Sequence, residues 1–203
     1  MPPSWICVFY CSKARSLEIR HNPLSYTQRL EKRDTSSIKL VVIHCTELPD
    51  LAMARVWGEK EIHPESHTGN SGHFYINRDG SVEQWVPLDR IAHHVRGHNP
   101  LSIGIELINN GRYPDWFHSA HQQMTEPYPG AQIEALATLL NQLTTQLPEL
   151  EDIAGHQDLD TAMLPSEDKP DIMINRKLDP GPHFPWSGLM NKISLNRLTV
   201  EDL

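Results

Sequence analysis

A lysine and an aspartate stand two residues apart in INRKLDPGP, the stretch from residue 174 to residue 182. In extended backbone, side chains two residues apart point to the same side, and Pro180 disfavours the helical conformation at Asp179. Lys177 and Asp179 are therefore expected to face the same space. A surface loop could carry such a pair without any role, so other residues must indicate whether a site lies beside them.

Two histidines follow stretches that are predicted to be strands. His44 follows LVVI and His156 follows IAG, and strand ends place side chains at the rim of a sheet, where sites usually form. Together with Asp179 they make two imidazoles and one carboxylate. This is the three-ligand set of many catalytic zinc sites, which leave a fourth position for water. Because the three positions are dispersed along the chain, two unrelated, hydrogen-bonded histidines remain the alternative.

Glu106 is the carboxylate whose position is hardest to explain without a function. It lies inside IGIELI, a predicted central strand, where burial without a partner is costly. One interpretation is a general base whose pKa is set by burial and by a nearby metal ion. The other is an ion pair with Arg78 or Arg90. Cys45 directly follows His44, so its side chain should point to the opposite face, as a buried core cysteine.

Apolar β-branched runs and one helical period outline the elements that would position these residues. Strands are expected at residues 38–45, 72–77, 81–86 and 101–108, and a helix at 131–147. The Asp-Gly pair at 79–80 predicts that the second and third strands form a hairpin. Residues 109–130 and 157–173 are interpreted as loops, the first bordering a site. Strands with a covering helix favour a mixed α/β architecture.

Composition restricts the partners and the compartment. The chain has 203 residues, which suits one domain, and its net charge of −8 without a basic run argues against a nucleic-acid partner. No stretch approaches the ~20 apolar residues of a membrane span. The odd count of cysteines (Cys7, Cys11 and Cys45) favours a reducing compartment. No signal peptide is recognisable, so a cytoplasmic monomer is expected, with a periplasmic or secreted protein as the alternative.

Six blocks of sequence resemble one enzyme family in this order: VVIHCTE, GHFYINRDGSVEQWVP, AHHVRG, SIGIELIN, AGHQD and RKLDPGPHFPW. The chain closely resembles the zinc-dependent N-acetylmuramoyl-L-alanine amidases, in the AmpD-like subgroup of the superfamily that includes peptidoglycan-recognition proteins and phage lysozyme-type amidases. The resemblance implies a single α/β domain over residues 37–190, with a central mixed β-sheet flanked by helices. Residues 1–36 would be a poorly regular arm and residues 191–203 a C-terminal tail.

Carried across block by block, the resemblance implies the site residues and the reaction. His44, His156 and Asp179 would bind one Zn²⁺ per chain, Glu106 would be the acidic catalytic residue, and Lys177 would stabilise the developing oxyanion. The substrate would be peptidoglycan or a soluble muropeptide. The bond cut would be the amide between the lactyl group of N-acetylmuramic acid and L-alanine of the stem peptide, in cell-wall turnover or muropeptide recycling.

Departures from the family pattern concern the substrate. His94 matches a family histidine, but His93 stands where relatives often have tryptophan, and Gly72 where some have tyrosine. We assign substrate binding to His94, Arg78 and Trp116, although Trp116 could equally pack against the core. A non-catalytic peptidoglycan-binding module of the same fold is the alternative function, and it would not require the catalytic residues. A zinc peptidase is a third hypothesis, but the HExxH signature of many such enzymes is absent.

Overall fold

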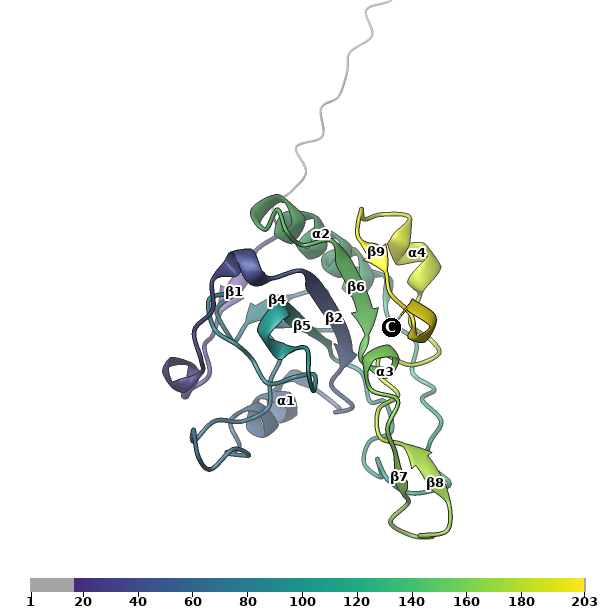
Figure 1. The fold of residues 1–203 in the computed structure, drawn as a ribbon. Coiled ribbons are helices and arrows are strands. Elements are labelled where there is room, and N and C mark those ends of the chain that lie inside the picture. Colours follow the sequence, from purple (N-terminus) through teal and green to yellow (C-terminus); the bar gives the residue numbers. More distant parts are fainter. Residues whose placement is uncertain (1–16, 203) are drawn as a thin grey trace, which may run out of the picture.

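Seven strands form a central sheet in the computed structural model, which describes residues 17–202 (Figure 1). They are β1 (Ile19–His21), β2 (Leu40–Cys45), β3 (Phe74–Ile76), β4 (Val82–Gln84), β5 (Ser102–Leu107), β6 (Asp152–Gly155) and β9 (Asn196–Arg197). Their order across the sheet is β1-β4-β3-β5-β2-β6-β9. The β3–β4 pair is antiparallel, as the predicted hairpin requires, and the other neighbours are parallel. The prediction of a central mixed sheet is confirmed.

Strand β2 runs between β5 and β6, parallel to both. All six of its residues are buried, which explains why the sequence of this strand is apolar and β-branched rather than alternating. His44 stands opposite Glu106 on β5, and Ile43 stands opposite Gly155, the last residue of β6. Because the carboxyl ends of parallel strands meet at one edge of a sheet, His44, Glu106 and His156 reach the same edge.

The two faces of the sheet are covered differently. Helix α2 (Gly130–Gln146) confirms the predicted helix and packs Leu136 and Leu140 against one face, in a core that includes Ile43 and Ile105 (Figure 1). On the other face, helix α1 (Leu51–Gly58) and the segment 24–30 surround a smaller core that contains Trp85. A third, small cluster contains Leu40 and Val42 of β2. Alternate side chains of the strands therefore pack into cores on opposite faces of the sheet.

Several short elements differ from the expectations. Residues 157–173, interpreted as a loop, contain most of helix α3 (His156–Leu159) and much of a hairpin of β7 (Met163–Pro165) and β8 (Met173–Asn175), which projects from the body in Figure 1. Helix α4 (Trp186–Met190) follows. The 3-10 turns are η1 (Thr27–Arg29), η2 (Thr35–Ser37), η3 (Asn99–Leu101) and η4 (Val200–Asp202). Elements this short lack the repeated period that sequence patterns need.

Both ends of the described chain join the sheet. Strand β1 pairs with β4, β9 pairs with β6, and Leu24 and Tyr26 are buried. The division into an arm at 1–36, a domain at 37–190 and a tail at 191–203 stays a prediction. Cys45 is buried, as expected, whereas Cys7 and Cys11 lie outside the described residues. Within residues 17–202, no helix combines the length and apolar character that crossing a bilayer demands.

Candidate active site

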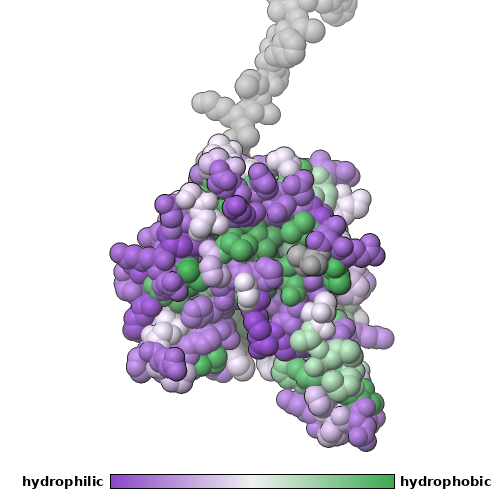
Figure 2. Space-filling view, viewed as in Figure 1, coloured by the Kyte–Doolittle hydropathy of each residue, from purple (hydrophilic) through white to green (hydrophobic). Residues whose placement is uncertain are grey.

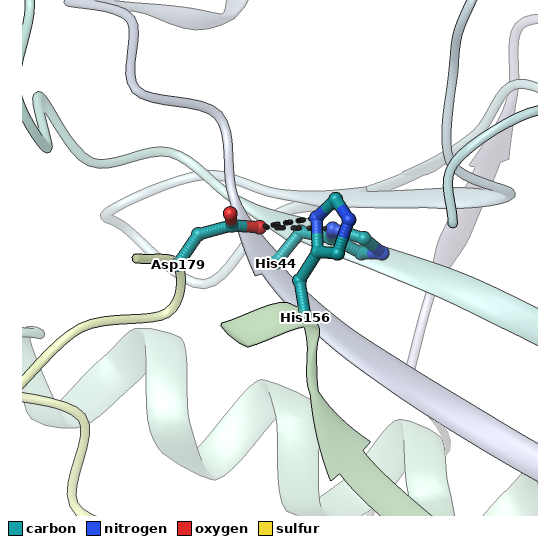
Figure 3. Close-up of side chains that lie close together, drawn as sticks. All are labelled: His44, His156 and Asp179. Carbon is teal, nitrogen blue, oxygen red and sulfur yellow. Dashed lines mark hydrogen bonds and ion pairs between the residues drawn. The ribbon is translucent and has the colours of Figure 1, made fainter. Parts of the chain in front are cut away.

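Three of the predicted site residues meet at the carboxyl edge of the sheet. Nδ1 of His44 and Nδ1 of His156 each lie 3.0 Å from the same oxygen, Oδ2 of Asp179. Figure 3 shows His44 arriving from β2, His156 from the start of α3, and Asp179 from the segment between β8 and α4. All three side chains are almost fully buried. One ligand atom from each lies within 4.8 Å of the others.

Backbone contacts fix the segment that carries Asp179. The Asp179 carbonyl accepts a hydrogen bond from the Gln157 amide at 2.9 Å, which ties the segment to α3 directly beside His156. The next carbonyl, of Pro180, accepts from the Tyr128 hydroxyl at 2.7 Å. Gly181 then turns the chain away with a φ of 86°, a value that favours glycine. Asp179 is therefore held from both sides.

A chain of hydrogen bonds decides which nitrogen of His44 carries the proton. The Ser102 hydroxyl donates its single proton to the carbonyl of His98 at 2.8 Å, so it accepts from Nε2–H of His94 at 3.2 Å. Burial lowers the pKa of His94 well below its usual value, so His94 is neutral and its Nδ1 is an acceptor. That Nδ1 lies 3.0 Å from Nε2 of His44, which must donate. Nδ1 of His44 therefore carries no proton.

The electrostatics around Asp179 fit a bound cation. Burial, followed by the charge of His156, lowers the pKa of His44 to about 4, so its Nδ1 stays a bare acceptor. Burial alone would raise the pKa of Asp179, but the charge of His156 and its hydrogen bond hold that pKa well below its usual value, so the carboxyl is ionised. Two acceptors thus face each other at 3.0 Å, and Oδ1 of Asp179 is buried without a hydrogen-bond partner. Two imidazoles and one carboxylate suit zinc.

Glu106 lies beside this cluster, on β5, and lines the same cavity. Burial raises the pKa of Glu106 to about 8, and the negative charge of Asp179 adds to the rise. The side chain has room because residue 72 is glycine: a Cβ atom there would lie 2.8 Å from Cγ of Glu106. The alternative ion pairs are absent from residues 17–202, since Arg78 bonds Glu126 and Arg90 bonds Gln28.

Lys177 and other cations line the cavity, which has a volume of about 720 Å³. The charge of Lys177 contributes to lowering the pKa values of His44 and Asp179 and opposes part of the rise in the pKa of Glu106. The sequence analysis assigned no role to two other lining residues, Trp57 and Arg96. Trp57 lies outside the six blocks, whereas Arg96 lies inside the block AHHVRG. Figure 2 shows the surface hollowed between the lobe that carries α1 and the projecting hairpin β7–β8.

The three residues assigned to substrate binding take different positions. His94 lines the cavity, but its ring nitrogens are bonded to His44 and Ser102. Arg78 is not among the lining residues; it donates to both oxygens of Glu126, at 2.6 and 3.0 Å. Trp116 is also outside the lining, and its indole donates to the carbonyl of Glu47. Substrate binding by His94, Arg78 and Trp116 stays a prediction.

A mixed sheet with two imidazoles, a carboxylate and a buried acid at one edge has the residue types that metal-dependent hydrolases use. The model of the N-acetylmuramoyl-L-alanine amidase family matches residues 34–182. The chain belongs to this family, which confirms the resemblance of the six blocks and the prediction of an amidase. The curated relatives AmpD and AmiD are named as amidases, which favours the enzyme over the alternative of a non-catalytic module.

The relatives are similar over most of the chain. The 1,6-anhydro-N-acetylmuramyl-L-alanine amidase AmpD of Enterobacter cloacae is 31% identical over 169 residues, which are 73% of this chain and 76% of the relative. The crystal structure of a selenomethionine AmpD derivative aligns with a TM-score of 0.62 at 26% identity, covering 87% of this chain and 94% of that one. AmiD of Escherichia coli aligns with a TM-score of 0.58 at 26% identity, covering 77% and 57% respectively. That AmiD structure is a complex with the substrate anhydro-N-acetylmuramic acid-L-Ala-D-γ-Glu-L-Lys.

Proposed function

We propose that this chain is a zinc-dependent amidase that holds one Zn²⁺ through His44, His156 and Asp179. The observation that carries the proposal is the pair of acceptors at 3.0 Å: the deprotonated Nδ1 of His44 faces the ionised carboxylate of Asp179. Such a contact is unfavourable without a cation between the two atoms. One ligand atom from each of the three residues lies within 4.8 Å of the others, so these side chains would hold the ion together.

The remaining residues have distinct roles in hydrolysis of the amide. A bound zinc ion supplies Lewis acidity toward the attacking water and the scissile carbonyl. The Glu106 carboxylate takes a proton from the water and then delivers it to the nitrogen of the leaving L-alanine. The ammonium group of Lys177 stabilises the negative charge that develops on the carbonyl oxygen, an interaction stronger in the transition state than in the ground state.

The proposed substrate is a soluble anhydro-muropeptide, cut between the lactyl group of N-acetylmuramic acid and L-alanine. Support comes from AmpD, which is named for the anhydro sugar, and from AmiD, whose complex contains one. The cavity adds support because its lining includes three cationic side chains, Arg96, Arg176 and Lys177, beside the carboxylates of Glu47, Glu106 and Asp179. A γ-linked glutamate leaves its α-carboxylate free to meet such cations. A cytoplasmic location and a monomeric state belong to the same proposal.

Mass spectrometry of the reaction products tests this function. Anhydro-N-acetylmuramic acid-L-Ala-D-γ-Glu-L-Lys and intact sacculi are incubated in parallel with the purified protein, with and without a chelator. We expect release of free tripeptide from the soluble substrate, loss of release with the chelator, recovery on adding Zn²⁺, and about one zinc per chain. Undiminished cleavage by metal-free protein would refute the zinc mechanism. Release from sacculi alone would reassign the substrate, and binding without release would indicate a non-catalytic module.

A further inference from the structure

A buried ion pair lies beside the candidate site and has no part in the chemistry described above. Glu47 follows His44 by three residues, and its carboxylate accepts from Nε of Arg112 at 2.6 Å and from Nη2 at 2.8 Å. The same carboxylate accepts from the backbone amide of Arg112 at 3.1 Å. Both side chains are almost fully buried, with 1% of Arg112 and 10% of Glu47 exposed. We call this pair the Glu47–Arg112 clamp.

The clamp reaches the segment that carries the proposed catalytic lysine. Nη1 of Arg112 donates to the carbonyl of Asn175 at 3.1 Å, and Nη2 donates to the carbonyl of Arg176 at 3.3 Å. With the bond from Nη1 to Gln122 at 3.2 Å, all five N–H donors of the guanidinium are engaged. The two carbonyls belong to the residues immediately before Lys177. One side chain therefore connects the turn after His44 to the start of the Lys177–Asp179 segment.

The local backbone is shaped to permit this contact. Glu47 has a φ of 49°, in the left-handed region that residues other than glycine seldom adopt. Gly111, next to Arg112, has a φ of 53°, and a Cβ atom there would lie 2.5 Å from Cγ of Glu47. A buried ion pair is weak evidence for stability, because well-packed apolar side chains often replace one without loss. The pair is therefore expected to fix the local conformation of the chain more than to increase the free energy of unfolding.

We propose that the Glu47–Arg112 clamp positions Lys177. By fixing the carbonyls of Asn175 and Arg176, the clamp sets the backbone from which the Lys177 side chain enters the cavity, and keeps the ammonium group aimed at the scissile carbonyl. Glu47 and Arg112 are positioning residues that act through Lys177, so the inference rests on the function proposed for that lysine. Geometry of this kind matters in catalysis because a displacement of about 1 Å can lower a rate ~10²-fold.

A double-mutant cycle tests the proposal with the zinc-loaded full chain and the anhydro-muropeptide. Arg112→Met, Lys177→Met and the double variant are compared by kcat and KM, per folded, zinc-containing molecule. We expect Lys177→Met to lower kcat ~10²–10³-fold and Arg112→Met to lower it ~10–10²-fold. In the Lys177→Met background, Arg112→Met should change kcat less than about twofold, because the group it positions is gone.

Arg55→Met is the matched control. Arg55 also pairs with a carboxylate, Glu59, and also binds two consecutive carbonyls, those of Asn22 and Pro23. It should leave kcat unchanged in both backgrounds. If Arg112→Met does not fold, Glu47→Gln preserves the side-chain volume and carries the same test.

The outcomes separate two failures. Multiplicative losses from Arg112→Met and Lys177→Met would overturn the clamp proposal while leaving the role of Lys177 intact. An unchanged kcat in Arg112→Met, accompanied only by a lower melting temperature, would make the clamp purely structural. An unchanged kcat in Lys177→Met would overturn the proposed role of the lysine, and the clamp proposal with it.

Discussion

Glu106 is a buried carboxyl group that lies beside the candidate cation site. Burial and the Asp179 charge raise its pKa to about 8, so the metal-free site holds a neutral acid at neutral pH. A divalent cation beside it would favour the carboxylate and lower that pKa. The residue would then become a base only when the cation is present. Metal occupancy and the protonation of the base are therefore coupled.

Replacing Glu106 with glutamine should separate catalysis from metal binding. The amide keeps the size of the side chain but cannot accept the water's proton, so kcat should fall ~10²–10⁴-fold. Zinc content should stay near one per chain, because Glu106 is not among the three clustered ligand residues. The exposed Glu151→Gln variant provides the control for loss of a carboxylate. Retained turnover in Glu106→Gln would assign the base to another residue.

The same substitution should stabilise the metal-free protein in a defined pH window. The folded-state pKa of about 8 exceeds the ordinary value of 4.5, so the folded chain binds a proton that the unfolded chain releases. The stability linked to this carboxyl is present below about pH 4.5 and is lost as the pH rises to about 8.

Chemical unfolding with a chelator present measures that linkage. Glu106→Gln should match the parent protein at pH 4.5 and exceed its unfolding free energy above pH 8 by roughly 5 kcal/mol, because each pH unit between the two pKa values contributes about 1.4 kcal/mol. A difference that does not depend on pH would contradict the raised pKa.

At the level of elements, a single glycine makes room for the hydrogen-bond chain that orients His44. Gly104 lies inside β5, where glycine usually weakens a strand or marks a close approach. A Cβ atom on Gly104 would lie 2.6 Å from Cγ of His94. Because the His94 ring is held between Ser102 and His44, it cannot move without breaking those contacts. Gly104 of β5 therefore makes room for the His94 ring, and His94 in turn determines which nitrogen of His44 carries the proton.

Gly104→Ala should consequently weaken zinc binding as well as the fold. Displacement of the His94 ring removes the partner of His44 Nε2, and loss of such a contact lowers metal affinity roughly 10–100-fold. Overpacking should also reduce the unfolding free energy by about 1–3 kcal/mol. The control is Gly188→Ala in α4, where a Cβ atom has nothing within 4 Å; it should bind zinc normally. Competition with a chromophoric chelator measures the zinc affinity, and equal affinities would contradict the orienting role of His94.

The elements that were predictable are those with a long local signal. Strand β2 begins with four consecutive apolar residues, β5 has an apolar residue at every second position, and α2 repeats its apolar positions over four turns. Strands β1 and β9 have three and two residues and gain their stability from pairing with distant neighbours. No window of sequence contains that information. The eight-residue helix α1 and the β7–β8 hairpin were missed for the same reason.

Some residues of the candidate site were predictable from the sequence, and others were not. Residue types and the six blocks identified His44, His156 and Asp179, and the structure brings these three together. The partners that orient them were out of reach, because Ser102–His94–His44 and Glu47–Arg112 each join segments far apart in sequence. Substrate binding by Arg78 stays a prediction, and its guanidinium donates to Glu126 and to the carbonyl of Pro49.

At the scale of the whole molecule, cationic side chains line the cavity of a chain whose net charge is negative. The chain carries a net charge of −8, and the cavity is lined by three cationic side chains and three carboxylates: Arg96, Arg176, Lys177, Glu47, Glu106 and Asp179. Arg176 pairs with Asp160, whereas Arg96 has no ion-pair partner among residues 17–202. The two guanidinium groups are close enough that, after burial, the charge of Arg96 lowers the pKa of Arg176. A ligand carboxylate would relieve this repulsion.

Arg96→Gln should therefore weaken the binding of an anionic stem peptide without changing the chemical step. Removing the cation loses an attraction made equally in the ground state and the transition state, so KM should rise about twofold to tenfold at constant kcat. The rise should shrink as the ionic strength increases, because the Debye length falls to about 3 Å at 1 M salt. Arg20→Gln, an exposed arginine outside the cavity lining, removes the same charge and is the control. Equal, small effects of the two variants would mean that only the net charge matters; a rise in KM confined to Arg96→Gln and abolished by salt would place the substrate carboxylate beside this side chain.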